Sequence, residues 1–126
     1  MPKIHKVLVI DDELIVREIT STSLEKLGLE VTQAKNGQQG LEKARQEIPD
    51  LIFLDYMMPG MSGMEVAIAL KQDAALAQIP IVMLSGKAES SDIQKAKEIG
   101  INHYLEKPAD PKKIMNFVRE EFLQDT

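Results

Sequence analysis

Four apolar residues in a row, residues 51–54, lead directly into a single acid, Asp55, and the breaker Pro59-Gly60 follows shortly after. A short apolar run between turn residues is typical of a strand that is buried on both faces, as in a parallel sheet. Asp55 is then placed at the carboxyl end of the strand, which is the edge of an open α/β sheet where ligands bind. Because a carboxylate is costly to bury alone, the pattern predicts partners for Asp55 elsewhere in the chain.

The same arrangement of a short apolar run and a helical segment repeats along the chain. The predicted strands are residues 6–10, 29–34, 51–54, 79–84 and 101–105. The segments with helical spacing are residues 14–27, 36–46, 62–73, 90–99 and 110–122. Strand followed by helix, five times, predicts an α/β fold: a doubly wound, flavodoxin-like parallel sheet of five strands with right-handed crossovers. The strand order 2-1-3-4-5 is the commoner one at this size.

Three of the predicted helices begin at recognisable capping residues. Asn36 and Asp110 are N-cap candidates, and a proline follows Asp110 at the first helical position. Ser62 and Glu65 have the spacing of a capping box, in which each side chain accepts a hydrogen bond from the main-chain amide at the other's position. These local signals agree with the boundaries that the apolar pattern gives.

Composition narrows the class of protein. The 126 residues suit one domain, and we expect a single domain over residues 1–126 with no output domain. The net charge is −5 and the basic residues are scattered, which predicts no direct binding to nucleic acid. There is no cysteine for a thiolate metal site, no apolar run long enough to cross a bilayer and no signal peptide. These features predict a cytoplasmic protein that does not enter a membrane.

Polar residues follow four of the five predicted strands. Asp11 and Asp12 come after the first, Asp55 ends the third, Ser85 follows the fourth and Lys107 follows the fifth. In the predicted strand order these groups converge on one edge, where three carboxylates repel one another unless cations are present. Lys107 supplies one positive charge. A site whose ligands are all oxygen atoms suits Mg²⁺ as the second cation. Asp55 then stays ionised and can attack a phosphoryl group as a nucleophile.

The motifs at these strand ends resemble the response-regulator receiver domain of two-component signalling. The matching motifs are Asp11-Asp12, Asp55-x-x-Met58-Pro59-x-x-x-Gly63, Ser85-Gly86 and Lys107-Pro108. The resemblance covers the whole chain, and the motifs fall in the family's order at the ends of four strands. It implies a phosphorylation-dependent switch that catalyses only its own phosphorylation and dephosphorylation.

The resemblance also implies a role for each residue of the site. Asp55 accepts a phosphoryl group from a histidine kinase or phosphotransfer protein. Asp11 and Asp12 bind Mg²⁺ together with Asp55, and the main-chain carbonyl of Met57 is a further ligand. Lys107 contacts the phosphoryl group, and its peptide bond to the following proline is commonly cis in the family.

The conformational response is expected to run through Ser85 as the switch hydroxyl and Tyr104 as the aromatic residue that changes rotamer. Residues 90–123 are the expected output face, for a homodimer or an effector protein. Ser85 stands where threonine is more frequent, Gly86 where alanine is frequent and Ala109 where phenylalanine is common. The last two differences bear on the size and rigidity of the response, not on phosphorylation.

The start of the first helix carries three apolar residues in a row, residues 14–16. Such a run cannot all face the core, so we expect one side chain to stay exposed beside the acidic site. Our hypothesis is that Ile15 helps to dock the helix hairpin of the kinase, near Pro108.

Each functional interpretation has a plainer alternative. Asp11 and Asp12 could cap the first helix, Lys107 could be a surface lysine, and Tyr104 could be a core aromatic residue. The two histidines, His5 and His103, lie outside the cluster and are interpreted as structural or surface residues. Met58 and Met64 are expected to pack beneath the loop that follows Asp55.

Three other functions compete with the switch. A phosphatase with an aspartate nucleophile requires a second acid two residues after the nucleophile, and this chain has Met57 at that position. A flavin-binding module wants a hydroxyl- and glycine-rich phosphate loop after the first strand, where Asp11 and Asp12 would repel phosphate. A degenerate receiver would bind a partner without phosphorylation, and the complete set of acids, hydroxyl and lysine argues against it.

Overall fold

The computed structural model describes residues 4–86, 90–108 and 110–124. Its centre is a parallel sheet whose strands lie in the order β2-β1-β3-β4-β5, which confirms the predicted topology. The strands are β1 (Lys6–Ile10), β2 (Glu30–Ala34), β3 (Leu51–Asp55), β4 (Ile81–Ser85) and β5 (His103–Glu106). The point where the strand order reverses lies between β1 and β3, so their carboxyl ends form the crevice that such sheets use for ligands.

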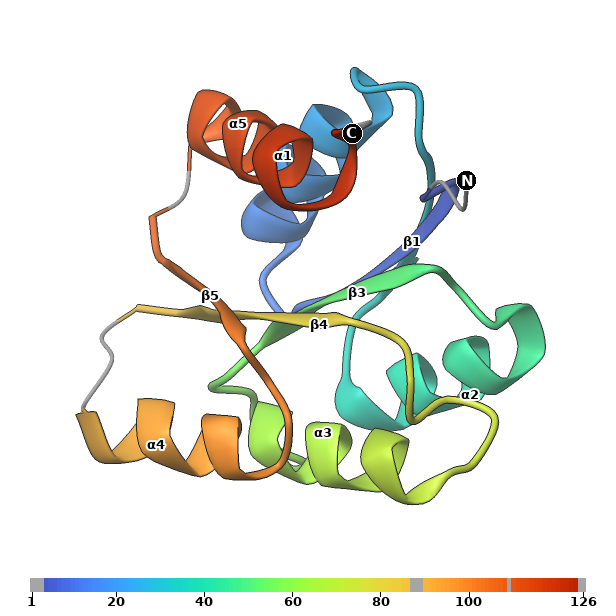
Figure 1. Ribbon diagram of the computed structural model, residues 1–126, viewed down its shortest axis with the longest axis vertical. Helices are drawn as coiled ribbons and strands as arrows, with labels where there is room; N and C mark the ends of the chain where they lie inside the picture. Colours follow the sequence, from blue (N-terminus) through green and yellow to red (C-terminus); the bar gives the residue numbers. More distant parts are fainter. Residues whose placement is uncertain (1–3, 87–89, 109, 125–126) are drawn as a thin grey trace.

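Helices cover both faces of the sheet (Figure 1). They are α1 (Leu14–Glu25), α2 (Gly37–Glu47), α3 (Gly63–Gln72), α4 (Ser90–Glu98) and α5 (Pro111–Phe122). One core cluster joins the sheet to α1 and α5, and the second joins it to α2, α3 and α4. Two helices therefore lie on one side of the sheet and three on the other.

The central strands send alternate side chains to the two cores. Val9 and Phe53 belong to the core on the α1 and α5 side, whereas Ile10 and Leu54 belong to the core on the other side. A strand alternates its side chains with a period of two, so Asp55 continues the row of Phe53 and projects on the α1 and α5 side. Ser85 continues the row of Met83, which packs in the core on the side of α2, α3 and α4.

Two predicted strand starts are wrong by two residues. β4 begins at Ile81 and β5 at His103, because Ile79 and Ile101 are buried in turns that precede the strands. The amide of Ile79 donates to the carbonyl of Leu76 at 3.1 Å, and the amide of Ile101 closes the end of α4. The hydrophobicity of these two residues reflects their burial in the core and not participation in the hydrogen-bonded ladder of a strand.

The local signals that the sequence predicts are confirmed. Asn36 accepts a hydrogen bond from the amide of Gln39, and Ser62 forms the complete capping box with Glu65. Asp110 accepts from the amide of Lys113 at the start of α5.

The residues expected to be structural occupy structural positions. Met58 is buried in the core, and Met64 packs against it. The ring of His103 lies edge-on to Phe117 and Phe122, with centroid distances of 5.9 and 4.9 Å. His5 is exposed, and its main-chain amide donates to Asp50.

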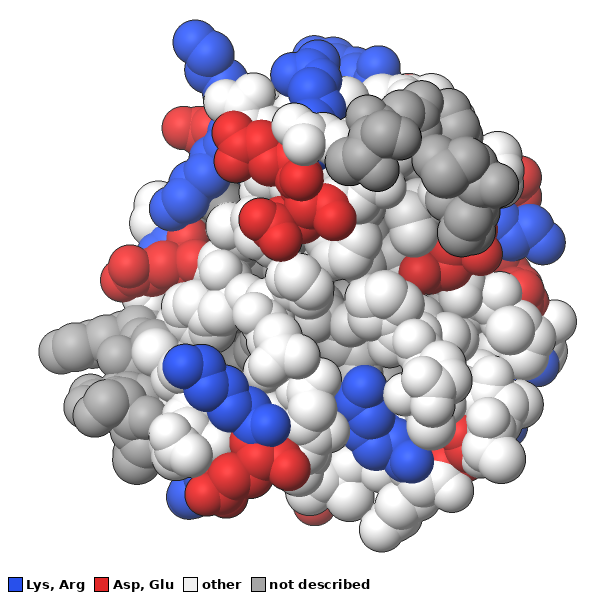
Figure 2. Space-filling view, viewed as in Figure 1, with Lys and Arg blue, Asp and Glu red and all other residues white. Residues whose placement is uncertain are grey.

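Charged side chains of both signs are interspersed on the face shown in Figure 2. Among the described residues on that face, there is no continuous basic surface of the kind that tracks a phosphate backbone. No helix within the described ranges has both the length and the apolar character that crossing a membrane requires.

Candidate functional site

Asp55 ends β3 at the carboxyl edge of the sheet, and only 2% of its surface is exposed. Asp11 follows β1 beside it and is fully buried, with its amide donating to the carbonyl of Ala34 in the β2 ladder. Because β1 and β3 are hydrogen-bonded neighbours, the two carboxylates meet on the same side of the sheet. The convergence that the sequence predicts for these acids is present in the structure.

Lys107 brings the positive charge to this cluster from the end of β5. Its Nζ lies 3.0 Å from Oδ1 of Asp55, 3.1 Å from Oδ2 of Asp11 and 3.3 Å from Oε1 of Glu13. Burial lowers the pKa of Lys107, but Asp55 and Asp11 outweigh it, so the net pKa is raised and the ammonium stays charged. The peptide bond to Pro108 is cis, as the family resemblance implies.

The surroundings raise the pKa of Asp55 from 3.8 to about 7. Burial is the largest cause, since it penalises the ionised form, and the neighbouring carboxylates of Asp11 and Asp12 act in the same direction. The hydrogen bond from Lys107 opposes them without cancelling them. Near neutral pH and without a further cation, Asp55 is therefore divided between its protonated and ionised forms.

Oxygen atoms of Asp11, Asp12 and Asp55 all lie within 4.8 Å of one another. Oδ2 of Asp55 is buried and has no hydrogen-bond partner among the described residues, so this carboxylate has an unused acceptor. Asp12 is partly open to solvent. Carboxylate oxygens with room for water are the ligand set of a hard divalent cation such as Mg²⁺, and the residues present fit that ion.

A pocket of about 380 Å³ opens above Asp55. Its lining residues are Glu13, Asp55, Tyr56, Met57, Ser85, Gly86, Asp92 and Lys107. Ser85 is buried at this pocket and Met57 is exposed beside it. The role of the Met57 carbonyl as a metal ligand stays a prediction.

Tyr104 lies away from the carboxylates, on the α3 and α4 side of the sheet. It pairs with Met83 across the β4–β5 ladder, and its hydroxyl is buried without a hydrogen-bond partner among the described residues. Its change of rotamer stays a prediction. Of the two differences from the family pattern noted near the switch, Gly86 is exposed, and no described residue lies within 4 Å of the position of an added Cβ atom. Ala109 lies outside the described residues.

The alternative reading of Asp11 as a helix cap is correct in part. Its Oδ1 accepts the amide of Glu13 at 2.9 Å, which holds the loop before α1. The N-cap position itself belongs to Glu13, and no side chain caps the helix there. The other oxygen of Asp11 still faces Lys107, so one carboxylate serves the loop and the site.

Gly63 has a steric role in the site. A Cβ atom at residue 63 would lie 2.2 Å from the main-chain carbonyl oxygen of Asp55. The amide of Gly63 also donates to the carbonyl of Tyr56 at 2.9 Å. The glycine of the Asp55-to-Gly63 motif therefore lets the start of α3 approach the end of β3.

Two side chains, those of Arg17 and Tyr56, make contacts at the site that sequence reasoning misses. Arg17 donates from Nη1 to the carbonyl of Asp11 and from Nε to Oε1 of Gln33, so it fixes the main chain at the acid pair. The hydroxyl of Tyr56 donates to Oδ1 of Asp92 at 2.7 Å and joins the residue after Asp55 to the first turn of α4. That hydrogen bond is the main cause of a raised pKa for Tyr56. None of these contacts follows a helix or strand period, so no local pattern signals them.

A parallel sheet in this order, with acids and a lysine at its carboxyl edge, defines the class of receiver domains. The profile of the family "Response regulator receiver domain" matches residues 7–119, and the chain belongs to this family. It is thus a receiver domain of the kind found in two-component signalling.

Two curated relatives are transcriptional regulatory proteins. The chain is 39% identical over 109 residues to the phosphate regulon transcriptional regulatory protein PhoB of Pseudomonas aeruginosa, covering 86% of this chain and 48% of the relative. It is 38% identical over 109 residues to the alkaline phosphatase synthesis transcriptional regulatory protein PhoP of Bacillus subtilis, covering 86% and 45%. The chain thus spans about half the length of these relatives.

Among solved structures, the chemotaxis protein CheY4 of Vibrio cholerae superimposes with a TM-score of 0.88 at 31% sequence identity. The match covers 93% of this chain and 98% of that one. Both comparisons agree with the receiver fold described above.

Proposed function

We propose that this domain is a phosphorylation-dependent switch in which Asp55 accepts a phosphoryl group from a histidine kinase or a histidine phosphotransfer protein. The observation that carries the proposal is the environment of Asp55. One carboxylate oxygen is held by Lys107 at 3.0 Å, and the other is unpartnered among the described residues. A nucleophile in a pocket with a fixed cation beside it suits attack on phosphorus.

The transfer forms one bond and breaks another. A carboxylate oxygen of Asp55 bonds to phosphorus, and the bond from phosphorus to the histidine nitrogen of the donor breaks. The electron pair of that bond stays on the imidazole nitrogen, and Asp55 becomes an acyl phosphate. Lys107 can interact with the phosphoryl oxygens, and Ser85 is proposed to donate a hydrogen bond to one of them.

The proposed metal ion is Mg²⁺, held by Asp11, Asp12 and Asp55, with the carbonyl of Met57 as a further ligand. When bound, it supplies positive charge next to the carboxylates and the phosphoryl oxygens. The raised pKa of Asp55 supports this proposal, because the acids need more positive charge than Lys107 provides for Asp55 to be fully ionised at neutral pH.

The proposed response passes from Ser85 and Tyr104 to the output face at residues 90–123, which forms a homodimer or binds an effector. The alternation along β4 supports this assignment, since Ser85 shares its side of the sheet with Met83, the ladder partner of Tyr104. The edge strand β5 and the helices on either side of it are the elements that this response would rearrange.

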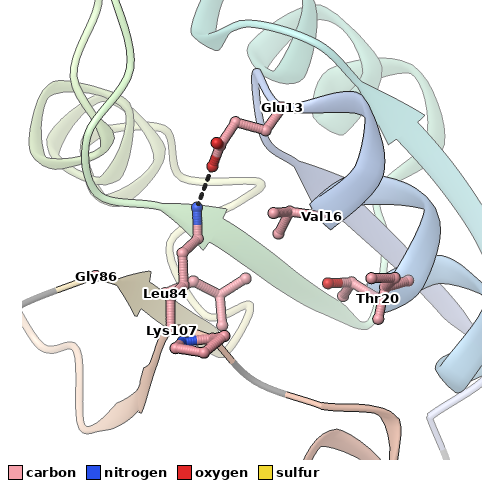
Figure 3. Close-up of a pocket in the computed structure, with 8 residues that line it drawn as sticks. Glu13, Val16, Thr20, Leu84, Gly86 and Lys107 are labelled. Atoms are coloured by element: carbon pink, nitrogen blue, oxygen red, sulfur yellow. Dashed lines mark hydrogen bonds and ion pairs between the residues drawn. The ribbon is translucent and has the colours of Figure 1, made fainter.

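Docking of the phosphodonor is proposed near Ile15 and Pro108. Leu14 and Ile15 are 61% and 73% exposed, one residue more than the expectation of a single exposed apolar side chain. Next to them, an apolar pocket of about 360 Å³ lies between α1 and the Lys107–Pro108 segment, with Val16 and Leu84 among its lining residues (Figure 3). A helix hairpin that carries the phosphohistidine could cover this surface.

The docking proposal predicts a difference between two kinds of donor. Ile15→Asp should slow transfer from the cognate kinase at least about fivefold and leave phosphorylation by acetyl phosphate within about twofold of the native rate, because a buried charge at an interface weakens binding by roughly 1–3 kcal/mol. Ile68→Asp is the matched control, since Ile68 is an exposed isoleucine on α3. An equal loss with both donors would contradict docking at Ile15.

The central claim is tested by mass spectrometry after incubation with Mg²⁺ and acetyl phosphate. The native protein should gain the mass of one phosphoryl group, and Asp55→Ala should gain none. Absence of the adduct in the native protein, or an unchanged adduct in the variant, would refute Asp55 as the acceptor.

The remaining parts of the proposal concern activity and context. The domain is proposed to catalyse only its own phosphorylation and dephosphorylation; the phosphatase alternative is disfavoured because Met57 stands where that chemistry wants an acid. A location in the cytoplasm stays a prediction.

A further inference from the structure

Glu13 places a fourth carboxylate at the mouth of the site, and the proposed transfer does not use it. Glu13 is the N-cap residue of α1, and its side chain is 61% exposed. Its Oε1 nevertheless lies 3.3 Å from Nζ of Lys107, as the dashed line in Figure 3 shows. An exposed glutamate therefore holds the lysine that the incoming phosphoryl group needs.

The ion pair between Glu13 and Lys107 stands where two pockets meet. Both residues line the pocket above Asp55 and also the apolar pocket between α1 and Pro108. In Figure 3 the carboxylate of Glu13 points away from α1 toward the lysine nitrogen at the edge of the apolar pocket. A phosphodonor that reaches Asp55 must pass close to this pair.

The hydrogen-bonding capacity of Lys107 makes Glu13 a competitor. An ammonium group has three donors, and the structure gives Lys107 three carboxylate neighbours: Asp11, Asp55 and Glu13. Asp11 and Asp55 are buried and fixed by the ends of their strands. Glu13 is solvated, so its carboxylate can return to water at little cost, because exposed ion pairs contribute little free energy. Glu13 is the neighbour that an arriving anion can replace.

We propose that Glu13 is a gating residue that selects against free anionic phosphodonors. In the resting state its carboxylate occupies one position at Lys107 and repels anions that approach from solvent. A protein donor that covers Leu14 and Ile15 also covers the neighbouring Glu13, and displaces its side chain as the contact forms. This inference rests on the proposed function and adds to it a residue that distinguishes protein-borne donors from small ones.

The size of the effect follows from the charge. A carboxylate about 6 Å from a phosphoryl anion, in a largely solvated setting, raises its free energy by an amount that corresponds to roughly a three- to tenfold slower reaction. Glu13→Gln removes the charge and keeps the shape of the side chain. Glu25→Gln is the matched control, because Glu25 is an exposed glutamate at the other end of α1 and the net charge changes equally.

The test measures the rate of phosphorylation by acetyl phosphate at saturating Mg²⁺, at low salt and at about 1 M salt, where charges are screened within about 3 Å. We expect Glu13→Gln to react about three to ten times faster than the native protein at low salt and Glu25→Gln to match the native rate. The gain should shrink toward unity at high salt.

Three results would overturn the gate while leaving phosphorylation of Asp55 intact. These are no gain in Glu13→Gln, an equal gain in Glu25→Gln, or a gain that high salt does not reduce. If the native protein forms no acyl phosphate at all, the proposed function and the gate fail together, so the two failures are distinguishable. Circular dichroism of both variants is expected to match the native protein, since both side chains are exposed.

Discussion

Replacing Asp55 by asparagine should change how the stability of the metal-free protein depends on pH. The folded protein raises the pKa of this carboxyl from 3.8 to about 7. Between these two pH values the unfolded chain loses the proton and the folded chain keeps it, so the native protein loses stability as pH rises. Asparagine does not titrate and keeps an oxygen that can accept from Lys107, so the variant lacks this loss.

The magnitude follows from the size of the pKa change. A rise from 3.8 to about 7 corresponds to about 4 kcal/mol of unfolding free energy once the titration is complete. Because the pocket above Asp55 opens to solvent, we expect about half of this, on the order of 2 kcal/mol. Lys107 does not interfere, because its raised pKa keeps it charged over this range.

The assay is urea unfolding in EDTA, followed by far-ultraviolet circular dichroism at several pH values from about 4 to about 8.5. The quantity of interest is the difference in unfolding free energy between Asp55→Asn and the native protein. It should grow by about 2 kcal/mol in favour of the variant between the acidic and the alkaline end. Using the change in this difference cancels any constant effect of losing the ion pair with Lys107.

Mg²⁺ provides the second half of the experiment. At about 100 times its dissociation constant, a ligand that binds only the folded state adds about 2.7 kcal/mol. Mg²⁺ should therefore restore the stability of the native protein at the alkaline end of the pH range. It should stabilise Asp55→Asn less, because one of the proposed ligands carries no charge in that variant. A difference that stays flat with pH, or that shrinks as pH rises, would refute the reasoning about charge at Asp55.

Other substitutions test contacts around the site. Tyr56→Phe should cost about 1–2 kcal/mol and speed amide hydrogen exchange in the first turn of α4, because its hydroxyl donates to Asp92. Tyr104→Phe, which removes a hydroxyl without a partner among the described residues, should be neutral or stabilising by urea unfolding. Gly63→Ala should cost about 3 kcal/mol or more and weaken Mg²⁺ binding in titration calorimetry, because the added Cβ meets the carbonyl of Asp55. Gly86→Ala should stay within about 0.5 kcal/mol of the native protein, because no described residue lies within 4 Å of the added Cβ.

The topology and the acid cluster can be predicted from the sequence because the strands are recognisable from local residue patterns. A short apolar run that ends in Asp11, Asp55 or Ser85 gives both the strand and the edge to which its last residue belongs. Once the strand order is known, no further information is needed to bring these residues together. The positions of the N-caps are equally local, since a capping side chain bonds within its own first turn.

The rest of the site depends on side chains that reach across the fold. Glu13 meets Lys107, and Tyr56 meets Asp92, only after strands and helices far apart in the chain have assembled. Neither pair has a spacing that sequence periodicity can detect. The sequence also places the starts of β4 and β5 two residues before Ile81 and His103, because hydrophobicity reports burial and cannot distinguish a buried turn from a buried strand.

Side chains alternate along β3 and β4, so residues near the site are distributed between the two helical layers on either side of the sheet. Phe53, whose row Asp55 continues, packs in the layer of α1 and α5, whereas Tyr104 and Met83, whose row Ser85 continues, pack in the layer of α2, α3 and α4. Figure 1 shows these two layers of helices on opposite faces of the sheet. A close-packed sheet separates these layers, so the loops at its carboxyl edge are the direct route between them. Substitutions in one layer that share no contacts with the other layer are therefore expected to act independently of it. Such a layout would let the proposed output face change its partner without any change in the proposed phosphorylation site.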